Sequence, residues 1–465
     1  MRTSRLVLLA ALAATGIATT GIVAPAAVPP DLVTLRPIAH HVGAASTAPL
    51  TTAQCATQFR IACYAPAQLQ RAYDLPALFA DGTEGQGQTI AIVDSFGSPT
   101  IQQDLNVFDQ TFALPTPKLT VIQPTGAVPP YNPHDADRVG WAGETDLDVE
   151  WAHAMAPMAS ILLVETPTSE NEGISGFPEI VTAEKFVIDN HLAAVISQSF
   201  SATEETFPSK ESLLALRGAY QDAAAKGVTV LTATGDSGAT DATVGPGDFT
   251  VPVTSWPGSD PLVTGVGGTE LSLDAQGNHT APDVVWNDTF DAPTQQYIFG
   301  DNGPHALAGG GGRSIVFPRP DYQFPVANVV GAQRGVPDIS MSGACNGSVN
   351  VFQSFGGQPA GWYPTCGTSE ATPLFAGIVA LAAQRAGHPL GLINPALYFM
   401  SRAHAPGIVD VTKGDNTVSF TQGGKLVTVA GFAARRGYDL ASGVGTIDAR
   451  LFVPELASFV DHGSW

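Results

Sequence analysis

The sequence is poor in cysteine, in basic residues and in recognisable metal or phosphate motifs. Four cysteines in 465 residues are too few for a disulfide framework, although they allow two bridges with three possible pairings. Only 21 lysines and arginines stand against 42 acidic residues, and a net charge of −21 argues against nucleic acid and anionic membranes as partners. The ten histidines show no HExxH spacing. The sequence therefore gives no indication of a nucleic-acid-binding, nucleotide-binding or zinc-peptidase protein.

Long apolar runs are also scarce, and the one with targeting character is N-terminal. Residues 1–27 begin with two arginines, continue through the apolar stretch Leu6–Ala14 and end near Ala24-Pro25-Ala26, which is typical of a cleavable signal peptide. The other apolar runs, such as residues 377–383, are too short to span a bilayer. We therefore expect a secreted, extracellular protein without a membrane partner.

The rest of the chain divides into a leader and one large domain. Residues 28–63 are rich in Pro, Ala and Thr and predict a mostly loose leader, with a possible short disulfide loop. Over residues 64–465, strands rich in Val and Ile alternate with helical patterns, as in QTIAIVD, ASILLVE, LAAVISQSF and GVTVLTA. This alternation predicts a single α/β domain with a mostly parallel central sheet and helices on both faces.

A candidate nucleophile, Ser369, stands at the start of an apolar helical run. Its segment, residues 367–384, reads GTSEATPLFAGIVALAAQ. Gly367 permits a tight backbone turn, and the helix after it is apolar nearly all round, as a core helix is. Unpaired N–H groups at its N-terminus suit developing negative charge, while Pro373 is expected to mark a first turn or a kink. The alternative is a capping Thr-Ser pair before an ordinary helix.

A second segment supplies a candidate base. In WAGETDLDVEWAHAMAP, residues 141–157, the helical period places Glu144 and Asp148 on one face. Repulsion between two such carboxylates raises one pKa, so the pair is a candidate acid/base dyad that shares a proton. The alternative is a solvated acidic face. Asp146 and Glu150, on the other side of the helix, are better candidates for that exposed role.

A third segment supplies a candidate oxyanion donor. Residues 228–239, VTVLTATGDSGA, predict a buried strand that breaks at Gly235 and presents Asp236. A protonated Asp236 could donate a hydrogen bond to an oxyanion. The alternative is a turn aspartate that accepts backbone N–H groups.

Together the three segments resemble the sedolisin family of serine-carboxyl peptidases, with the family's order Glu, Asp, Asp, Ser. The resemblance extends from about residue 64 to about residue 456 and includes TIAIVDSFG, VISQSFS, SWPGSDPLVTGVGGTEL, GGGGRSIVFPRPDYQ and GVPDISM. It implies a subtilisin-like fold and a monomeric, acid-active endopeptidase that acts on polypeptides. In that family's mechanism Ser369 would be the nucleophile, Glu144 the general base and later acid, Asp148 its partner and Asp236 the oxyanion donor.

The resemblance also implies one structural calcium ion near the C-terminus. The matching segments, VDVTKGD and ARRGYDLASGVG, would supply oxygen ligands, which suit a hard cation. The implied ligands are the side chains of Asp410 and Asp439 and the carbonyl groups of Val411, Arg435 and Gly437. Arg435 stands where relatives usually have glycine.

The cysteines allow a structural interpretation and a catalytic one. Cys55 with Cys63 would close a short N-terminal loop, and Cys345 with Cys366 would tie the chain before Ser369 to the region after residue 338. A catalytic Cys366 is the competing interpretation, but no histidine is placed to activate it.

Two other functions remain open. A subtilisin-like Ser-His-Asp peptidase could use Asp94 and Ser369, although the nearest histidine, His153, lies near the far end of its helix. An inactive secreted binding protein on a peptidase scaffold is favoured by the leader, which is short where sedolisins usually carry a long folded prosegment. Asp94 could instead extend the carboxylate network of a sedolisin-like site.

Overall fold

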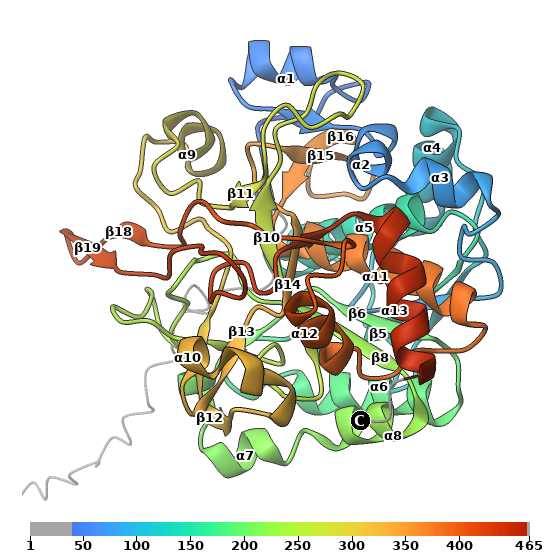
Figure 1. Ribbon diagram of the computed structural model, residues 1–465. Helices are drawn as coiled ribbons and strands as arrows, with labels where there is room; N and C mark the ends of the chain where they lie inside the picture. The colour runs from blue at the N-terminus through green and yellow to red at the C-terminus, as the bar shows by residue number, and fades with distance from the viewer. Residues whose placement is uncertain (1–39, 463–465) are drawn as a thin grey trace, which may run out of the picture. The chain divides into compact units, whose positions relative to one another are not determined.

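A mostly parallel sheet of eight strands organises the fold (Figure 1). The computed structural model describes residues 40–462. The strand order is β11-β10-β8-β6-β3-β5-β4, and β14 pairs with β10 in addition. The pairings within it are parallel except that between β10 and β11. The strands are β3 (Thr89–Ser95), β4 (Leu119–Ile122), β5 (Ser160–Thr166), β6 (Val195–Gln198), β8 (Thr229–Ala233), β10 (Thr264–Glu270), β11 (Val284–Val285) and β14 (Ile339–Ser342).

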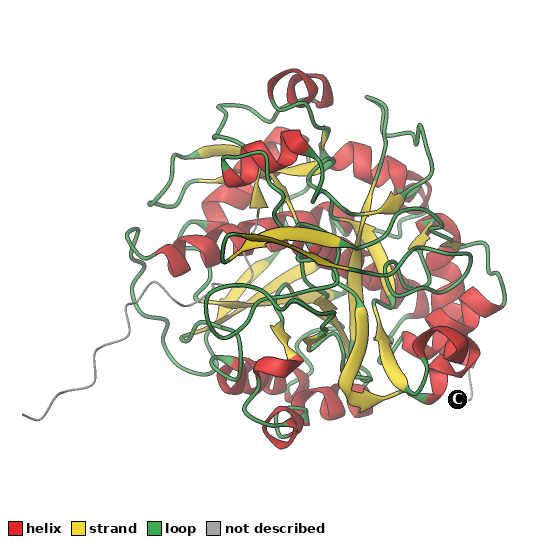
Figure 2. Cartoon of the chain, turned by 90° about the vertical axis from the view of Figure 1, so that its left-hand side faces the viewer, coloured by secondary structure: helices red, strands yellow, loops and turns green. Residues whose placement is uncertain are grey.

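Helices cover both faces of this sheet (Figure 2). Successive side chains of a strand point to opposite faces, so Ile90 and Ile92 join one apolar core while Ala91 and Val93 join the other. The expected α/β fold with helices on both faces is thus confirmed. The helices are α1 (Thr52–Gln58), α2 (Pro66–Ala72), α3 (Leu75–Ala80), α4 (Ile101–Phe112), α5 (Ala136–Met155), α6 (Phe177–Asp189), α7 (Lys210–Leu214), α8 (Gly218–Lys226), α9 (Ala292–Phe299), α10 (Ala327–Val330), α11 (Thr368–Ala386), α12 (Asn394–Arg402) and α13 (Ala449–His462).

Smaller sheets and single turns complete the described part. A four-stranded sheet has the order β1-β16-β15-β2, and four pairs of strands stand apart from it. Its strands are β1 (His40–His41), β2 (Cys63–Tyr64), β15 (Ser348–Gln353) and β16 (Gly361–Cys366). The separate pairs are β7 (Ala202–Thr203) with β9 (Ser255–Trp256), β12 (Gly312–Pro318) with β13 (Gln333–Val336), β17 (Ile408–Val409) with β20 (Thr446–Ile447), and β18 (Val418–Gln422) with β19 (Lys425–Val429). The 3₁₀ turns are Glu204–Thr206 and Asp321–Val326.

Two buried helices, α5 and α11, lie against each other on one face of the main sheet (Figure 1). In α5 every residue from Trp141 to Met155 is buried, and in α11 every residue from Thr368 to Ala383. A helix that is buried on every side lies in the interior of its domain. Pro373 lies inside α11 rather than ending it. The two helices therefore bring their chemical groups together in the interior.

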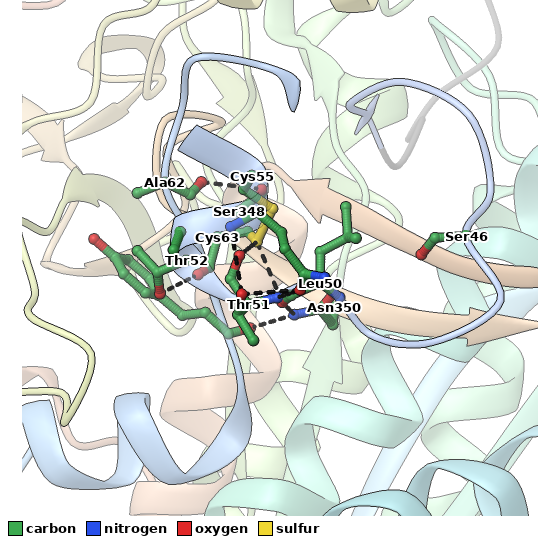
Figure 3. The surroundings of a disulfide bond; sticks show 12 residues. Ser46, Leu50, Thr51, Thr52, Cys55, Ala62, Cys63, Ser348 and Asn350 are labelled. Atoms are coloured by element: carbon green, nitrogen blue, oxygen red, sulfur yellow. Dashed lines mark hydrogen bonds between the residues drawn. A yellow bond between two sulfur atoms is a disulfide. The ribbon is translucent and has the colours of Figure 1, made fainter. Parts of the chain in front are cut away.

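The segment before residue 64 is ordered where the structure describes it. Strand β1 pairs with β16, and the backbone N–H and C=O groups of Leu50 bond to the side chain of Asn350 at 3.0 and 3.1 Å (Figure 3). This corrects the expectation of a loose leader for residues 40–63. These residues are held by partners that come some 300 positions later, and a pattern in the local sequence cannot indicate such partners. The expected signal peptide and residues 28–39 lie outside the described part.

Both expected disulfides are present. Cys55 is bonded to Cys63 within the N-terminal segment, as Figure 3 shows, and Cys345 is bonded to Cys366 at the end of β16. The catalytic interpretation of Cys366 is therefore wrong, because its sulfur is not a free thiol. Within residues 40–462, no helix is long and apolar enough to cross a membrane.

Candidate active site

Ser369 lies in the first turn of α11 and is 2% exposed. Gly367, the residue that caps this helix, has φ of 138°, a conformation that side chains other than glycine's rarely adopt. Pro373 has no N–H, so the carbonyl group of Ser369 lacks its usual partner within the helix. The hydroxyl group of Ser199 lies 3.4 Å from that carbonyl oxygen and donates to Asp148 Oδ1 at 2.8 Å. Ser199 thus connects the backbone of Ser369 to α5.

Glu144 faces Ser369 from α5. Its side chain is fully buried, and burial raises its pKa well above the ordinary value. The nearby Ser369 hydroxyl group lowers the pKa, whereas the charges of Asp94 and Asp236 raise it. Neither carboxyl oxygen reaches a hydrogen-bond partner within 3.5 Å among the described residues. A buried carboxyl group beside a serine hydroxyl, with free acceptor capacity, can act as a general base.

Asp148 and Asp94 extend the carboxyl network behind Glu144. Burial raises the pKa of Asp148 well above its usual range, as do the charges of Asp94 and then Glu144, and the Ser199 hydrogen bond lowers it. Burial also raises the pKa of Asp94 to about 7, against a lowering by Thr145. Three carboxyl groups in a buried region cannot all ionise at modest cost, so they retain protons well above pH 4.

Asp236 follows β8 and reaches across to the start of α11. Its Oδ1 accepts hydrogen bonds from Thr368, 2.7 Å from the backbone nitrogen and 2.6 Å from the hydroxyl oxygen. The glycine-rich loop fixes its backbone, because Ala308 donates to the Asp236 carbonyl at 2.8 Å and Gly310 donates to Gly235 at 2.7 Å. With Oδ1 engaged by donors, Oδ2 is the oxygen that could carry a proton toward a substrate. It lies 3.6 Å from His40 Nε2.

The two acids of α5 that were expected to be exposed, Asp146 and Glu150, are buried. Asp146 and Glu150 are both 0% exposed, and burial raises the pKa of each well above its usual range. Strand β15 covers Glu150, whose carboxyl group accepts from the backbone N–H of Phe352 at 3.0 Å. Asp104 of α4 contributes to the raised pKa of both. The acidic helix is thus a buried element, which sequence periodicity alone could not indicate.

The histidine required by the subtilisin-like alternative is paired elsewhere. His153 Nε2 lies 3.1 Å from Asp109 Oδ1 on α4, and both side chains are buried. This pairing gives no support to a triad of His153 with Asp94 and Ser369.

The predicted calcium ligands lie near one another, but their carboxyl groups already have partners. Asp410 Oδ2 accepts from the backbone nitrogen of Gly437 at 2.9 Å, and Asp439 Oδ2 accepts from that of Arg435 at 2.8 Å. The other oxygen of Asp439 accepts from Ala441 and Ser442. Over residues 40–462 no three His, Cys, Asp or Glu side chains are grouped to hold a metal ion. Two carboxylates with carbonyl oxygens are nevertheless the donor chemistry that calcium accepts.

Several residues of the site escaped the sequence-based prediction. Ser199 stands in the polar sequence directly after β6, which is a recognisable position for a functional group. Glu370, next to Ser369, is fully buried, and burial followed by the charge of Asp236 raises its pKa. His40 belongs to the segment predicted to be loose, and no local signal could have placed it beside Asp236.

Comparison with known proteins places the chain in a family. The model of the Subtilase family (Peptidase_S8) matches residues 85–423. The chain therefore belongs to the subtilase family of serine peptidases. Kumamolisin of Bacillus sp. (strain MN-32) is 33% identical over 364 residues, which are 77% of this chain and 58% of that protein. Sedolisin of Pseudomonas sp. (strain 101) is 29% identical over 368 residues, covering 77% and 56%. Within the subtilases, the chain is a member of the sedolisin family.

Other relatives and one solved structure extend the comparison. Tripeptidyl-peptidase 1 of Homo sapiens is 27% identical over 400 residues, 82% of this chain and 62% of that protein. The chain thus spans less than two thirds of the length of these relatives. A structure of Pseudomonas sedolisin (serine-carboxyl proteinase) with two molecules of pseudo-iodotyrostatin superposes with a TM-score of 0.68 at 24% identity, over 87% of this chain and all of that one. This likeness shows that the fold is shared.

Proposed function

We propose that the chain is an acid-active serine-carboxyl endopeptidase that hydrolyses polypeptides through an acyl-enzyme on Ser369. The observation that carries the proposal is the approach of a buried Glu144 to the Ser369 hydroxyl group, with Asp236 held against the first turn of the same helix. A carboxyl group replaces histidine as the base, so the chemistry must run at a pH where carboxyl groups exchange protons.

The proposed reaction is a double displacement. The Glu144 carboxylate takes the proton of Ser369, and the serine oxygen attacks the substrate carbonyl carbon. The resulting oxyanion accepts a hydrogen bond from protonated Asp236. Glu144 then gives its proton to the leaving amine as the peptide bond breaks. Glu144 then takes a proton from water, which attacks the acyl carbon; the bond to the Ser369 oxygen breaks, Glu144 returns the proton to that oxygen, and the acyl half leaves as a carboxylic acid.

Asp148 and Asp94 would share protons with Glu144, so that the three carboxyl groups together carry one negative charge instead of three. Two protons shared among the three carboxyl groups leave Glu144 able to accept a proton from Ser369 while its two neighbours stay neutral. Their raised pKa values and common burial support this role.

The direct test compares peptide hydrolysis at about pH 3 to 5 by the wild type, Ser369→Ala and Glu144→Gln. We expect each variant to lose several powers of ten in rate while its circular dichroism spectrum is unchanged. Glu150→Gln is the matched control, because it alters a buried acid of the same helix whose carboxyl group bonds to Phe352 instead. It should stay active. Full turnover by a folded Ser369→Ala protein would overturn the assignment, and an inactive wild type would favour the binding-protein alternative.

Secretion, a monomeric state and a structural calcium ion belong to the same proposal. The N-terminal sequence supports secretion, and N-terminal sequencing of protein from the culture medium tests it. The side chains of Asp410 and Asp439, with the carbonyl groups of Val411, Arg435 and Gly437, would hold calcium. For Asp439, binding requires exchange of its present N–H partners for the ion.

Chelation tests the calcium site independently of catalysis. Ions that bind only the folded state raise the melting temperature by mass action, so EDTA should lower it. Asp410→Ala should remove this sensitivity, whereas Asp415→Ala, an acid of the same loop, should retain it. Equal melting curves with and without chelator would contradict the site.

A further inference from the structure

The segment of residues 40–46 lies along the strand that leads into the nucleophile. His40 pairs with Cys366 and His41 with Thr365 in an antiparallel register, and Cys366 stands three positions before Ser369. The backbone N–H of Val42 donates to Pro364 at 2.8 Å. The segment then continues to Ser46, which exchanges two backbone hydrogen bonds with Trp362 at 2.9 Å. Figure 3 shows Ser46 beside this sheet.

The segment runs in the direction expected for the part of a bound substrate that is C-terminal to the scissile bond, here called the leaving-group half. Because β16 runs toward Ser369 and β1 is antiparallel to it, the N-terminal end of β1 is nearest the nucleophile and the chain then runs away from it. In a bound peptide, the part C-terminal to the scissile bond runs away from the nucleophile with the same polarity. An extended peptide that adds to a sheet edge needs the N–H and C=O groups of that edge. On β16 these groups are already used.

The two histidines of the segment contact the catalytic surroundings. His40 Nε2 lies 3.6 Å from Asp236 Oδ2, the oxygen proposed to serve the oxyanion. His41 Nδ1 lies 3.0 Å from Thr365 Oγ1, and its ring lies 4.6 Å from that of Tyr363. A Cβ atom on Gly143, the residue before Glu144, would come within 3.6 Å of His41 Nε2. The segment therefore touches the elements that carry both the base and the oxyanion donor.

We propose that residues 40–46 form a blocking segment, an internal strand that occupies the leaving-group half of the substrate groove and is displaced when a long peptide binds. This inference rests on the proposed peptidase function, since it takes Ser369 as the nucleophile. A substrate must replace the hydrogen bonds of Val42 and the paired histidines to lie against β16. A short amide substrate, which places no residues on that side, has nothing to displace.

Acid favours release of the blocking segment. Burial, and then the nearby His40, lower the pKa of His41 to about 4, against a raising by Gln353 of β15. The other titratable groups around it are Tyr363 on β16, whose pKa burial raises, and His134, which lines the same hollow ahead of α5. A displaced His41 would regain an ordinary pKa of about 6.5. The equilibrium constant for detachment of the segment therefore rises on the order of a hundredfold between neutral pH and pH ~4. His40 has Asp236 and Phe299 as its neighbours.

The kinetic test uses Val42→Pro, which removes the N–H that bonds to Pro364, with Val42→Ala as the matched control that keeps it. Two substrates are compared at pH 6 and pH 4: a fluorogenic octapeptide cleaved internally and a peptidyl aminocoumarin with residues on the acyl side alone. We expect Val42→Pro to raise kcat/KM for the octapeptide at pH 6 about tenfold, with the aminocoumarin and the control unchanged. Equal or lower values for both substrates would show a purely structural strand.

A second variant tests the proposal if Val42→Pro does not fold. His41→Phe keeps an aromatic ring against Tyr363 but cannot take a proton. In the wild type the octapeptide-to-aminocoumarin ratio of kcat/KM should rise from pH 6 to pH 4, and in His41→Phe it should not. The same rise in both proteins would overturn the proposal.

Binding separates this inference from the proposed function. In a Ser369→Ala background, fluorescence anisotropy measures octapeptide binding without catalysis. Val42→Pro should tighten the octapeptide Kd about tenfold at pH 6 if the segment blocks the groove. An unchanged Kd would overturn the blocking role even in an active enzyme. If the wild type cleaves neither substrate and Val42→Pro still tightens octapeptide binding, the peptidase function alone is refuted.

Discussion

At the scale of single residues, the site is defined by which oxygen atoms already have partners. Asp236 Oδ1 accepts two hydrogen bonds from Thr368, and Oδ2 lies 3.6 Å from His40 Nε2. Ser199 occupies Asp148 Oδ1, while Asp148 Oδ2 and both oxygens of Glu144 have no partner among the described residues. The oxygens of Glu144 and Asp148 Oδ2 are where a proton can move without breaking a hydrogen bond between described residues.

Asp236→Asn tests the proposed oxyanion donor. An asparagine keeps an oxygen for Thr368 and donates from Nδ2 at every pH, whereas a carboxyl group donates only while protonated, and an ordinary aspartate loses its proton near pH ~4. We expect a wild-type rate optimum below neutrality. In Asp236→Asn the alkaline limb should move to higher pH even though the peak rate falls. A wild-type optimum at or above pH 7 would contradict the carboxyl mechanism and favour a histidine base.

At the scale of elements, the turn into α11 and the acid-bearing helix α5 position the chemistry. Helix α5 places Glu144 and Asp148 toward Ser369, and Asp146 and Glu150 toward α4 and β15. The turn at Gly367 brings Ser369 beside Asp236. This turn admits little change, because a Cβ atom there would lie 2.6 Å from Asp236 Oδ2.

Gly367→Ala should therefore impair both activity and stability. The φ of 138° strains any other residue, at a cost of about 1–3 kcal/mol, and the methyl group would displace Asp236. We expect kcat to fall at least tenfold in the folded fraction. The matched control is Gly227→Ala, at φ of 77° with no atom within 4 Å of its Cβ position. It should lose stability, measured by urea unfolding, while kcat is retained; an equal kcat in both variants would contradict the steric argument.

At the scale of the whole molecule, the described part buries many more acids than it pairs with bases. Burial raises the pKa of Asp94 to about 7 and those of Glu144, Asp146, Asp148 and Glu150 well above their usual range. A carboxyl group with a raised pKa in the folded state binds its proton more tightly when folded. Its contribution to stability is complete below pH ~4 and is lost as pH rises through the folded-state pKa.

The melting temperature should consequently fall between pH 4 and pH 8. Each pKa unit corresponds to about 1.4 kcal/mol per group, so the five acids outweigh His41, whose lowered pKa acts in the opposite direction. Calorimetry at pH 4, 6 and 8 measures the trend, and Asp94→Asn should flatten it between pH 6 and pH 8. A melting temperature that rises steadily with pH would show that these acids ionise freely in the folded protein.

The sequence by itself determined the parallel α/β architecture and the segments that carry Glu144, Asp148, Asp236 and Ser369, whereas the pairing of the four cysteines came from the structure. These features depend on patterns within one segment: runs of Val and Ile for buried strands, an apolar helix after Gly367, and the four-residue spacing of Glu144 and Asp148. Such patterns act over a few residues and are visible without knowledge of the fold.

The tertiary structure alone decided which polar groups are buried and what lies beside them. Asp146 and Glu150 look like solvent-facing acids until α4 and β15 cover them, and His40 looks like part of a loose leader until it pairs with β16. Their environments come from partners far along the chain, and no local pattern records such a partner. Burial sets the pKa values, and burial is a property of the folded molecule because desolvation depends on every element that packs around a group.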